Sequence, residues 1–113
     1  MKYSLKKYEK LSLEKEFKYV FQNGKKIFSP YLRLYFAVNN LNYSRLGISI
    51  KKKFGNAVER NKAKRHIREI FRLNKNLKQN VDLIVIIENK FKTLNFEARK
   101  NTFLSLLKKI NLI

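Results

Sequence analysis

Cationic and amide side chains recur at helical spacing between positions 51 and 73, in the segment KKKFGNAVERNKAKRHIREIFRL. At 100° per residue, one arc of a helix collects the polar residues at i, i+3, i+4, i+7 and i+11 from position 61, with Arg60 at its border. We term this set the basic stripe: Arg60, Asn61, Lys64, Arg65, Arg68 and Arg72. Glu59 and Glu69 lie off the arc, whereas a solvated helix face usually mixes both signs in i,i+4 pairs. The stripe therefore indicates a polyanionic ligand.

Side chains for catalysis or metal binding by the chain itself are absent from the sequence pattern. The 8 acidic residues are scattered, and no pair is spaced for general acid and base work. The chain has no cysteine and one histidine, His66, which we interpret as a surface residue because no second ligand stands at metal-binding spacing. Ser29, Ser49 and Ser105 have no plausible His and Asp partners. We expect neither a catalytic residue nor a protein-bound metal.

The basic stripe requires a helix that begins just before it. Asn56 follows a Phe-Gly pair and stands at an N-cap position, with Glu59 three residues later in a capping-box arrangement. These signals predict a helix that begins at about Ala57. Beside the stripe, a narrow apolar arc must be buried against the rest of the fold. This arc comprises Ala63, Ile67, Ile70 and Phe71.

The remaining segments predict a mixture of helices and strands. Alternating side chains predict strands at 32–38 and 45–53, with a shorter one at 27–29, and turn Arg33, Tyr35, Arg45, Ser49 and Lys51 toward one outer face. The almost wholly apolar segment 81–87 predicts an interior strand covered on both faces. Helices are expected from a Ser12 cap to Gly24 and, after an Asn95 cap, over 96–110. This order predicts an α+β fold with one sheet and helices mainly on one side.

Length and charge narrow the class of protein. The chain of 113 residues is sized for a single domain, and its 44% apolar residues argue for a folded core. Lys and Arg number 27 against 8 Asp and Glu, and the net charge of +19 favours nucleic acid or an anionic membrane as partner. No apolar run approaches membrane-spanning length and no secretory signal is recognised, so we expect a cytoplasmic protein. Residues 1–10 read as a mobile basic arm.

The segment KKKFGNAVERNKAKRHIRE resembles the signature of the protein subunit of bacterial ribonuclease P, in which basic residues precede a Gly-Asn-Ala-Val turn and an Arg-Asn helix start. The resemblance extends over LSLEKEFKYVFQNGKKI, LRLYF, RLGISIKKK and VDLIVII, and thus over most of the chain. Three positions depart from the family pattern. Lys10 and Lys51 stand where arginine and serine are frequent, and Glu88 where a basic residue often follows the last strand. A lysine in place of arginine keeps the charge but loses the planar fork.

The resemblance implies a two-layer α/β sandwich with a single mixed sheet of about four strands, three helices and a left-handed βαβ crossover, of the ribosomal protein S5 domain 2-like type. It implies an RNA-binding subunit of a ribonucleoprotein endoribonuclease. In that family a catalytic RNA performs the Mg²⁺-dependent removal of the 5′ leader from precursor tRNA, and the protein binds this RNA and the single-stranded leader. The Mg²⁺ would be held mainly by RNA, and one protein monomer would bind one RNA.

Two sets of site residues follow. The resemblance and the charge pattern together assign contacts with the catalytic RNA to Lys52, Lys53, Asn56, Arg60, Asn61, Lys64, Arg65, Arg68 and Arg72. The resemblance and strand alternation assign the leader cleft to Phe17, Phe21, Tyr35, Ser49 and Lys51. By pattern alone, the i,i+4 pair Phe17 and Phe21 is more typical of a core.

Two other classes of protein share part of this pattern. A ribosomal or generic structured-RNA-binding protein would share the charge and the sheet. A membrane-surface amphipathic protein would share the basic helices, but the predicted strands require the apolar helix faces for a core. Both alternatives remain open from the residues alone.

Overall fold

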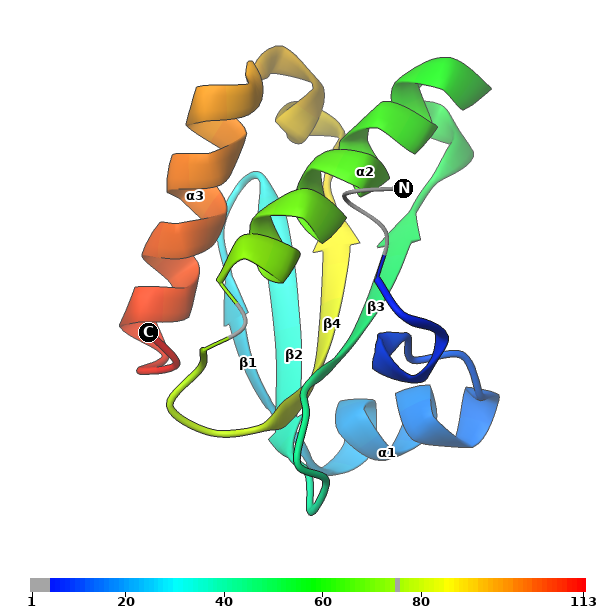
Figure 1. The fold of residues 1–113 in the computed structure, drawn as a ribbon. Helices are drawn as coiled ribbons and strands as arrows, with labels where there is room; N and C mark the ends of the chain where they lie inside the picture. The colour runs from blue at the N-terminus through cyan, green and yellow to red at the C-terminus, as the bar shows by residue number, and fades with distance from the viewer. Residues whose placement is uncertain (1–4, 75) are drawn as a thin grey trace.

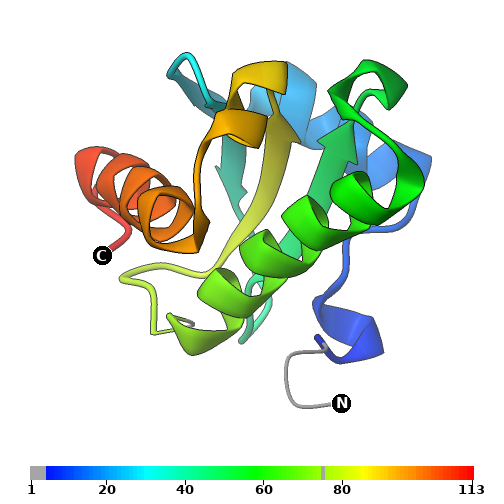
Figure 2. The same cartoon turned by 90° about the horizontal axis from the view of Figure 1, so that it is seen from above.

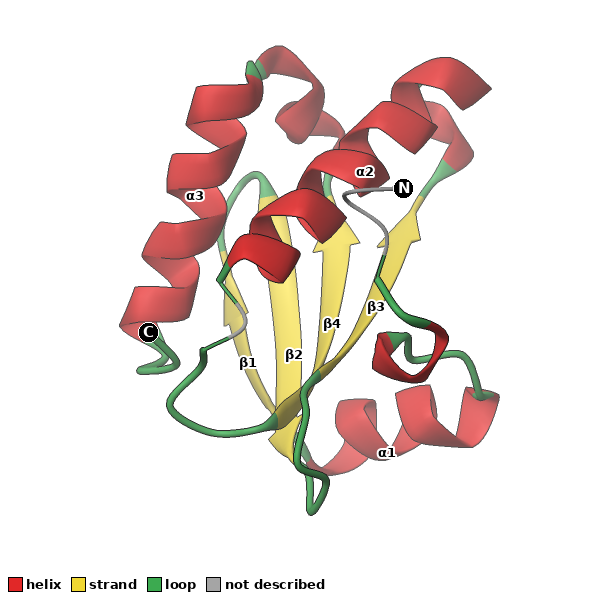
Figure 3. Cartoon of the chain, in the orientation of Figure 1, coloured by secondary structure: helices red, strands yellow, loops and turns green. Residues whose placement is uncertain are grey.

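The computed structural model describes residues 5–74 and 76–113, which form one sheet and three α-helices (Figures 1 and 3). The helices are α1 (Glu14–Asn23), α2 (Ala57–Leu73) and α3 (Phe96–Lys109). The strands are β1 (Lys25–Phe28), β2 (Leu32–Val38), β3 (Arg45–Ile50) and β4 (Val81–Ile87). Short 3-10 turns are η1 (Lys7–Glu9), η2 (Lys52–Phe54) and η3 (Asn89–Thr93).

The sheet is mixed, with strand order β1-β2-β4-β3. β4 pairs antiparallel with β2 and parallel with β3, and α2 makes the crossover between the two parallel strands. In Figure 1, β3 and β4 both point up, α2 lies in front of the sheet and β4 lies to the left of β3, so this crossover is left-handed. The predicted α+β fold class is confirmed. The interior position of β4 is confirmed too, and six of its seven residues are buried.

α2 and α3 cover one face of the sheet (Figure 2). The predicted apolar arc of α2 is confirmed: Ala63, Ile67, Ile70 and Phe71 are at most 1% exposed. They pack with inward residues of β2 and β4 in one large cluster. Burying a large apolar side chain contributes about 1.5–3 kcal/mol, so this arc fixes the rotation of α2 and turns the basic stripe outward.

α1 lies on the opposite face of the sheet, beside β2 and β4 (Figure 2). Its buried Val20 packs with Leu11 and Ile84 in a second, smaller cluster. The helix begins at Glu14 rather than after a Ser12 cap. Leu13 is the N-cap residue, and its backbone N–H donates to Glu16 Oε1 at 3.1 Å. The single short helix leaves Phe28 of β1 and Ser49 of β3 exposed on this face.

The segment before α1 differs from the expected mobile arm. Leu5 is 5% exposed and belongs to the main core cluster, and Lys10 forms an isolated parallel bridge with Leu46 of β3. The Leu11 N–H donates to the Leu46 carbonyl at 3.0 Å. Residues 5–10 therefore lie along the outer edge of β3, because Leu5 finds apolar partners that are distant in sequence. Residues 1–4 of the predicted arm lie outside the described part of the chain.

Candidate nucleic-acid interface

Capping interactions fix the start of α2 where the sequence predicts it. The Glu59 N–H donates to Asn56 Oδ1 at 2.8 Å, and the Asn56 N–H donates to Glu59 Oε1 at 2.9 Å. The hydrogen bond from the Asn56 N–H, reinforced by Lys92, lowers the pKa of Glu59. The side-chain oxygen of Asn56, a residue that the resemblance assigns to RNA binding, is thus engaged in the cap.

The basic stripe runs along α2 as the sequence predicts. Asn61 and Arg65 are exposed, while Lys64, Arg68 and Arg72 are half-buried. Arg60 is turned toward the start of the helix, where its Nη1 donates to the Gly55 carbonyl at 2.7 Å. Lys52 and Lys53, in the η2 turn before the helix, are exposed and extend the cationic surface. The charges lie on a rigid element, which suits the positioning of phosphates.

Residues of both predicted sets meet in one cavity of about 150 Å³ between α1, β3 and α2. Phe17 lines it from α1, and Lys64 and Arg68 line it from α2. Lys10 also lines this cavity, from the segment that lies along β3. Two residues of the basic stripe and Phe17 of α1 therefore border the same cavity.

Gly47 allows Phe17 to reach this cavity. A Cβ placed on Gly47 would lie 2.6 Å from Phe17 Cζ, well inside van der Waals contact. The ring lies directly over the backbone of β3 and is half-buried. Phe17 therefore packs at the edge of the second core cluster and also lines an open cavity.

An aromatic cluster lies on the same face of the sheet, around Tyr35. The Phe21 and Tyr35 ring centroids are 4.8 Å apart at 74°, an edge-to-face contact, and Phe21 is 45% exposed. The Phe28 ring lies 5.7 Å from Tyr35 and is 47% exposed. Arg33 Nη2 donates to the Tyr35 hydroxyl at 3.2 Å, and the Arg33 guanidinium lies 4.5 Å from the Phe28 ring centroid. Exposed rings beside a guanidinium are typical of surfaces that bind single-stranded nucleic acid.

Phe28 has no role in either set of site residues expected from the sequence. The signal was present in the turn after it: residues 29–31 form a tight connection that pairs Phe28 with Arg33. Side chains at paired positions share a face of the sheet, so this hairpin brings Phe28 beside Tyr35.

The register of the sheet relates Ser49 and Lys51 to the cluster. Arg33 pairs with Ile86 of β4, and Ile86 pairs with Ser49 of β3, so Ser49 shares the face of Arg33 across two strand spacings, roughly 10 Å. Ser49 is exposed, and exposed Lys51 follows the end of β3. Both residues border the open face of the sheet but lie apart from the aromatic cluster around Tyr35.

An ion-pair network anchors α1 above the sheet. Arg45 pairs with Glu16 of α1 through Nη1, and it donates to both Asp82 oxygens, at 2.8 Å from Nε and 2.7 Å from Nη2. The hydrogen bonds and charge of Asp82, together with Glu16, raise the pKa of Arg45. Two carboxylates are thereby held inside the fold, which leaves the outer surface more cationic.

His66 is half-buried rather than a surface residue as predicted. Its Nδ1 lies 3.1 Å from Arg99 Nη1, and its ring meets the Phe96 ring edge-to-face at 4.9 Å. The surface interpretation of His66 was wrong because the partners come from α3, 30 and 33 positions away.

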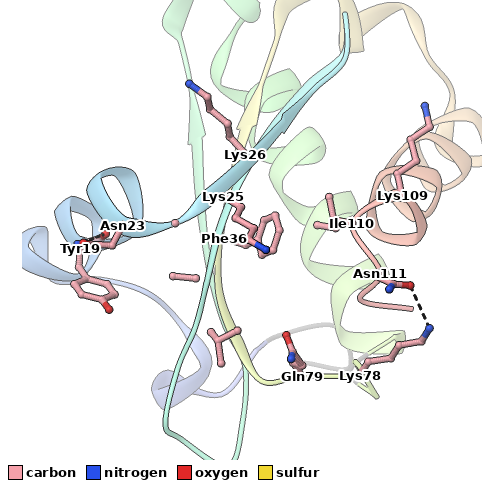
Figure 4. Close-up of a pocket in the computed structure, with 13 residues that line it drawn as sticks. Tyr19, Asn23, Lys25, Lys26, Phe36, Lys78, Gln79, Lys109, Ile110 and Asn111 are labelled. Carbon is pink, nitrogen blue, oxygen red and sulfur yellow. Dashed lines mark hydrogen bonds between the residues drawn. The ribbon is translucent and has the colours of Figure 1, made fainter.

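A larger cavity of about 750 Å³ lies between α1, β1 and the end of α3, and none of the predicted site residues lines it (Figure 4). Four lysines and a hydrogen bond between Lys78 and Asn111 border it. Across residues 5–74 and 76–113, no three His, Cys, Asp or Glu side chains gather as metal ligands. Within the same ranges, no helix has the length and hydropathy needed to span a bilayer.

Comparison with known proteins agrees with this architecture. The Ribonuclease P family model matches residues 5–111. The ribonuclease P protein component of Thermotoga maritima is 41% identical over 107 residues, covering 90% of this chain and 92% of that protein. The corresponding component of Clostridium botulinum (strain Loch Maree) is 39% identical over 105 residues, covering 91% and 95%.

Two solved structures are also similar. A mutant of the Staphylococcus aureus RNase P protein superposes with a TM-score of 0.90 at 31% identity, over 95% of this chain and 92% of that one. The Thermotoga maritima RNase P protein superposes with a TM-score of 0.80 at 40% identity, over 89% and 96%. The chain therefore belongs to the ribonuclease P protein family, the protein components of a ribonucleoprotein endoribonuclease that processes tRNA.

Proposed function

We propose that this chain binds the catalytic RNA of ribonuclease P and the single-stranded 5′ leader of precursor tRNA, and so assists endonucleolytic removal of the leader. One observation carries the proposal: Phe17, Lys64 and Arg68 line the same cavity, so a cationic surface and an aromatic surface adjoin. The net charge of +19 supports an RNA partner.

The basic stripe is the proposed contact with the catalytic RNA. Arg65 and Arg68 can each offer a planar fork to a phosphate or a base edge, whereas Lys64 supplies a point charge. Each neutralised phosphate releases counterions, with a log–log salt slope of about −0.7 to −0.9 per contact. Affinity for the RNA subunit should therefore fall steeply with salt concentration.

The aromatic cluster is the proposed contact with the leader. Phe21, Phe28 and Tyr35 present ring faces and edges to unpaired bases, and stacking contributes about 1–3 kcal/mol per base. Arg33 adds a cation beside the rings. Ser49 and Lys51 would contact the leader backbone farther along the open face. Phe17 would lie where the leader passes toward the catalytic RNA.

The chemical step is proposed to belong to the RNA. Glu16 and Asp82 are both held by Arg45, and the described residues do not converge as a set of metal ligands. As the family resemblance implies, Mg²⁺ would be held mainly by the RNA. The protein would act in the cytoplasm, as one monomer with one RNA.

Reconstitution with a bacterial ribonuclease P RNA tests the proposal. Arg65→Ala combined with Arg68→Ala should weaken binding to the RNA subunit and slow leader removal at low Mg²⁺. The control, Lys108→Ala with Lys109→Ala, removes the same charge from exposed positions at the end of α3. If the stripe variant matched the wild type in both assays, the stripe assignment would be wrong. A wild-type protein that bound RNA without stimulating leader removal would instead favour a generic RNA-binding module.

A further inference from the structure

A cavity of about 530 Å³ lies between α2, η3 and the beginning of α3. Lys62 and His66 line it from α2, Lys92 from η3, and Phe96 and Arg99 from α3. None of the residues assigned to the basic stripe or the leader cleft lines it. The cavity is therefore separate from the surface described above.

Arg99 is a buried cation in the wall of this cavity. The residue is 6% exposed, and its guanidinium lies 4.7 Å from the Phe91 ring centroid. Nη1 donates to His66 Nδ1 at 3.1 Å, and Nη2 donates to the Phe91 carbonyl at a long 3.4 Å. Nε is buried and has no hydrogen-bond partner among the described residues. Within the same residues no carboxylate pairs with Arg99, and burial lowers its pKa.

An uncompensated buried cation is costly, because it loses hydration without gaining an opposite charge. The neighbouring His66 supplies no negative charge to compensate Arg99. Burial and the charges of Arg99, Lys62 and Arg65 lower the pKa of His66 to about 4, so the imidazole is neutral at pH 7. Because a guanidinium only donates, His66 Nδ1 must accept, and the ring hydrogen is carried on Nε2.

The remaining wall of the cavity also favours an anion. The positive end of the α3 dipole lies there, at Asn95 and Phe96. Glu59 is the acidic residue among the lining side chains, and it is engaged by the Asn56 N–H and by Lys92 at 3.3 Å. Lys62, Lys92 and Arg99 thus face one carboxylate that is already bonded.

We propose that this cavity binds a phosphate group, with Arg99 and Lys62 as its principal cationic partners and the beginning of α3 beside it. A tetrahedral anion offers acceptors in several directions, which matches donors that reach the cavity from three separate elements. The group can belong to a free phosphate compound or to an RNA backbone. This site goes beyond the proposed function, since its residues belong neither to the stripe nor to the leader cleft.

His66 is the only histidine in the sequence, so its ring signals in an NMR spectrum of the full chain are assigned without ambiguity, and the ring lies in the wall of this cavity. Inorganic phosphate should shift them saturably at constant ionic strength set with chloride, and it should raise the pKa of His66 from about 4 because a bound anion favours the imidazolium. A short RNA lacking terminal phosphates forms a second arm. A shift with RNA at lower concentration assigns the group to an RNA backbone, whereas a shift with phosphate alone assigns it to a free compound.

Two variants and a control separate binding from folding. Arg99→Gln should abolish the saturable shift. The double variant Lys62→Ala with Lys92→Ala changes exposed residues only. It should weaken phosphate binding at least about tenfold, which corresponds to about 1.4 kcal/mol. The control variant Lys108→Ala with Lys109→Ala should leave the phosphate titration of the His66 signals unchanged. Circular dichroism tests whether each variant is folded. A shift that never saturates, equals that of chloride, or persists unweakened in the Lys62 and Lys92 variant overturns the proposal.

Discussion

Gly47→Ala tests whether close packing of Phe17 on β3 supports the aromatic surface. The added Cβ would lie 2.6 Å from Phe17 Cζ and 3.2 Å from Leu11 Cβ. The first distance is about 0.8 Å shorter than ordinary van der Waals contact. The ring must move away from the strand, and α1 must shift with it. Overpacking of this kind costs about 1–3 kcal/mol.

A double-mutant cycle tests whether the stability cost of Gly47→Ala comes from contact with Phe17. Urea unfolding should show the Gly47→Ala cost in the wild-type background. In a Phe17→Leu background the smaller side chain vacates the ring position, so the additional cost of Gly47→Ala should fall below about 0.5 kcal/mol. The coupling between the two sites should therefore be about 0.5–2.5 kcal/mol. An equal cost in both backgrounds would refute the packing argument.

The same variants separate packing from base contact. In the reconstituted enzyme, Gly47→Ala should reduce the preference for precursor over mature tRNA, because the displaced Phe17 no longer lines the cavity. In the double variant most of the Gly47→Ala stability cost should be recovered, but this preference should not, since leucine has no ring face to stack. Recovery of both properties would mean that the ring makes no contact with the leader.

Three further predictions concern other parts of the molecule. Tyr35→Ala should weaken the binding of precursor tRNA by about 1–3 kcal/mol more than the binding of mature tRNA. The control Tyr35→Phe keeps the ring and loses only the hydroxyl contact with Arg33. Equal weakening of both binding affinities by Tyr35→Ala would argue against a leader contact. Arg45→Met should destabilise the protein by on the order of 3 kcal/mol in urea unfolding, because it leaves Asp82, 6% exposed, without its cation; a change below about 0.5 kcal/mol would show that the network does not anchor α1. The pKa of His66 is about 4 in the folded state and 6.5 in the unfolded chain, so the unfolded state binds the proton at higher pH and the free energy of unfolding should fall as pH decreases from 6.5 to 4. His66→Gln should remove that part of the pH dependence. Identical profiles of stability against pH for the variant and the wild type would contradict this prediction.

The start and the faces of α2 were predictable from the sequence. The Asn56 cap, the buried arc that includes Ile67, and the outward stripe that includes Arg65 all depend on residues within a few positions of one another. Local helix geometry decides such relations, so spacing alone is sufficient. The handedness of the crossover into β4, in contrast, could not be predicted from local spacing. It was expected from the family resemblance, because no local pattern encodes which way a chain turns between parallel strands.

Contacts between distant segments required the tertiary structure. Residues 5–10 looked like a mobile arm because their basic residues show no periodic apolar face, yet Leu5 reaches the main core. Phe28 joins Tyr35 only through the β1–β2 register, and His66 meets Arg99 only because α2 and α3 pack together.

The charge, the order of elements and the two faces of α2 follow from composition and from periodicity within single segments. The tertiary structure places Lys64 and Arg68 of the stripe on the same cavity as Phe17, and the missing side chain of Gly47 allows Phe17 to pack onto β3. It also decided that Arg99 is buried without a carboxylate partner among the described residues. Burial and proximity between distant residues are set by how the elements pack, and no spacing along the chain specifies that packing.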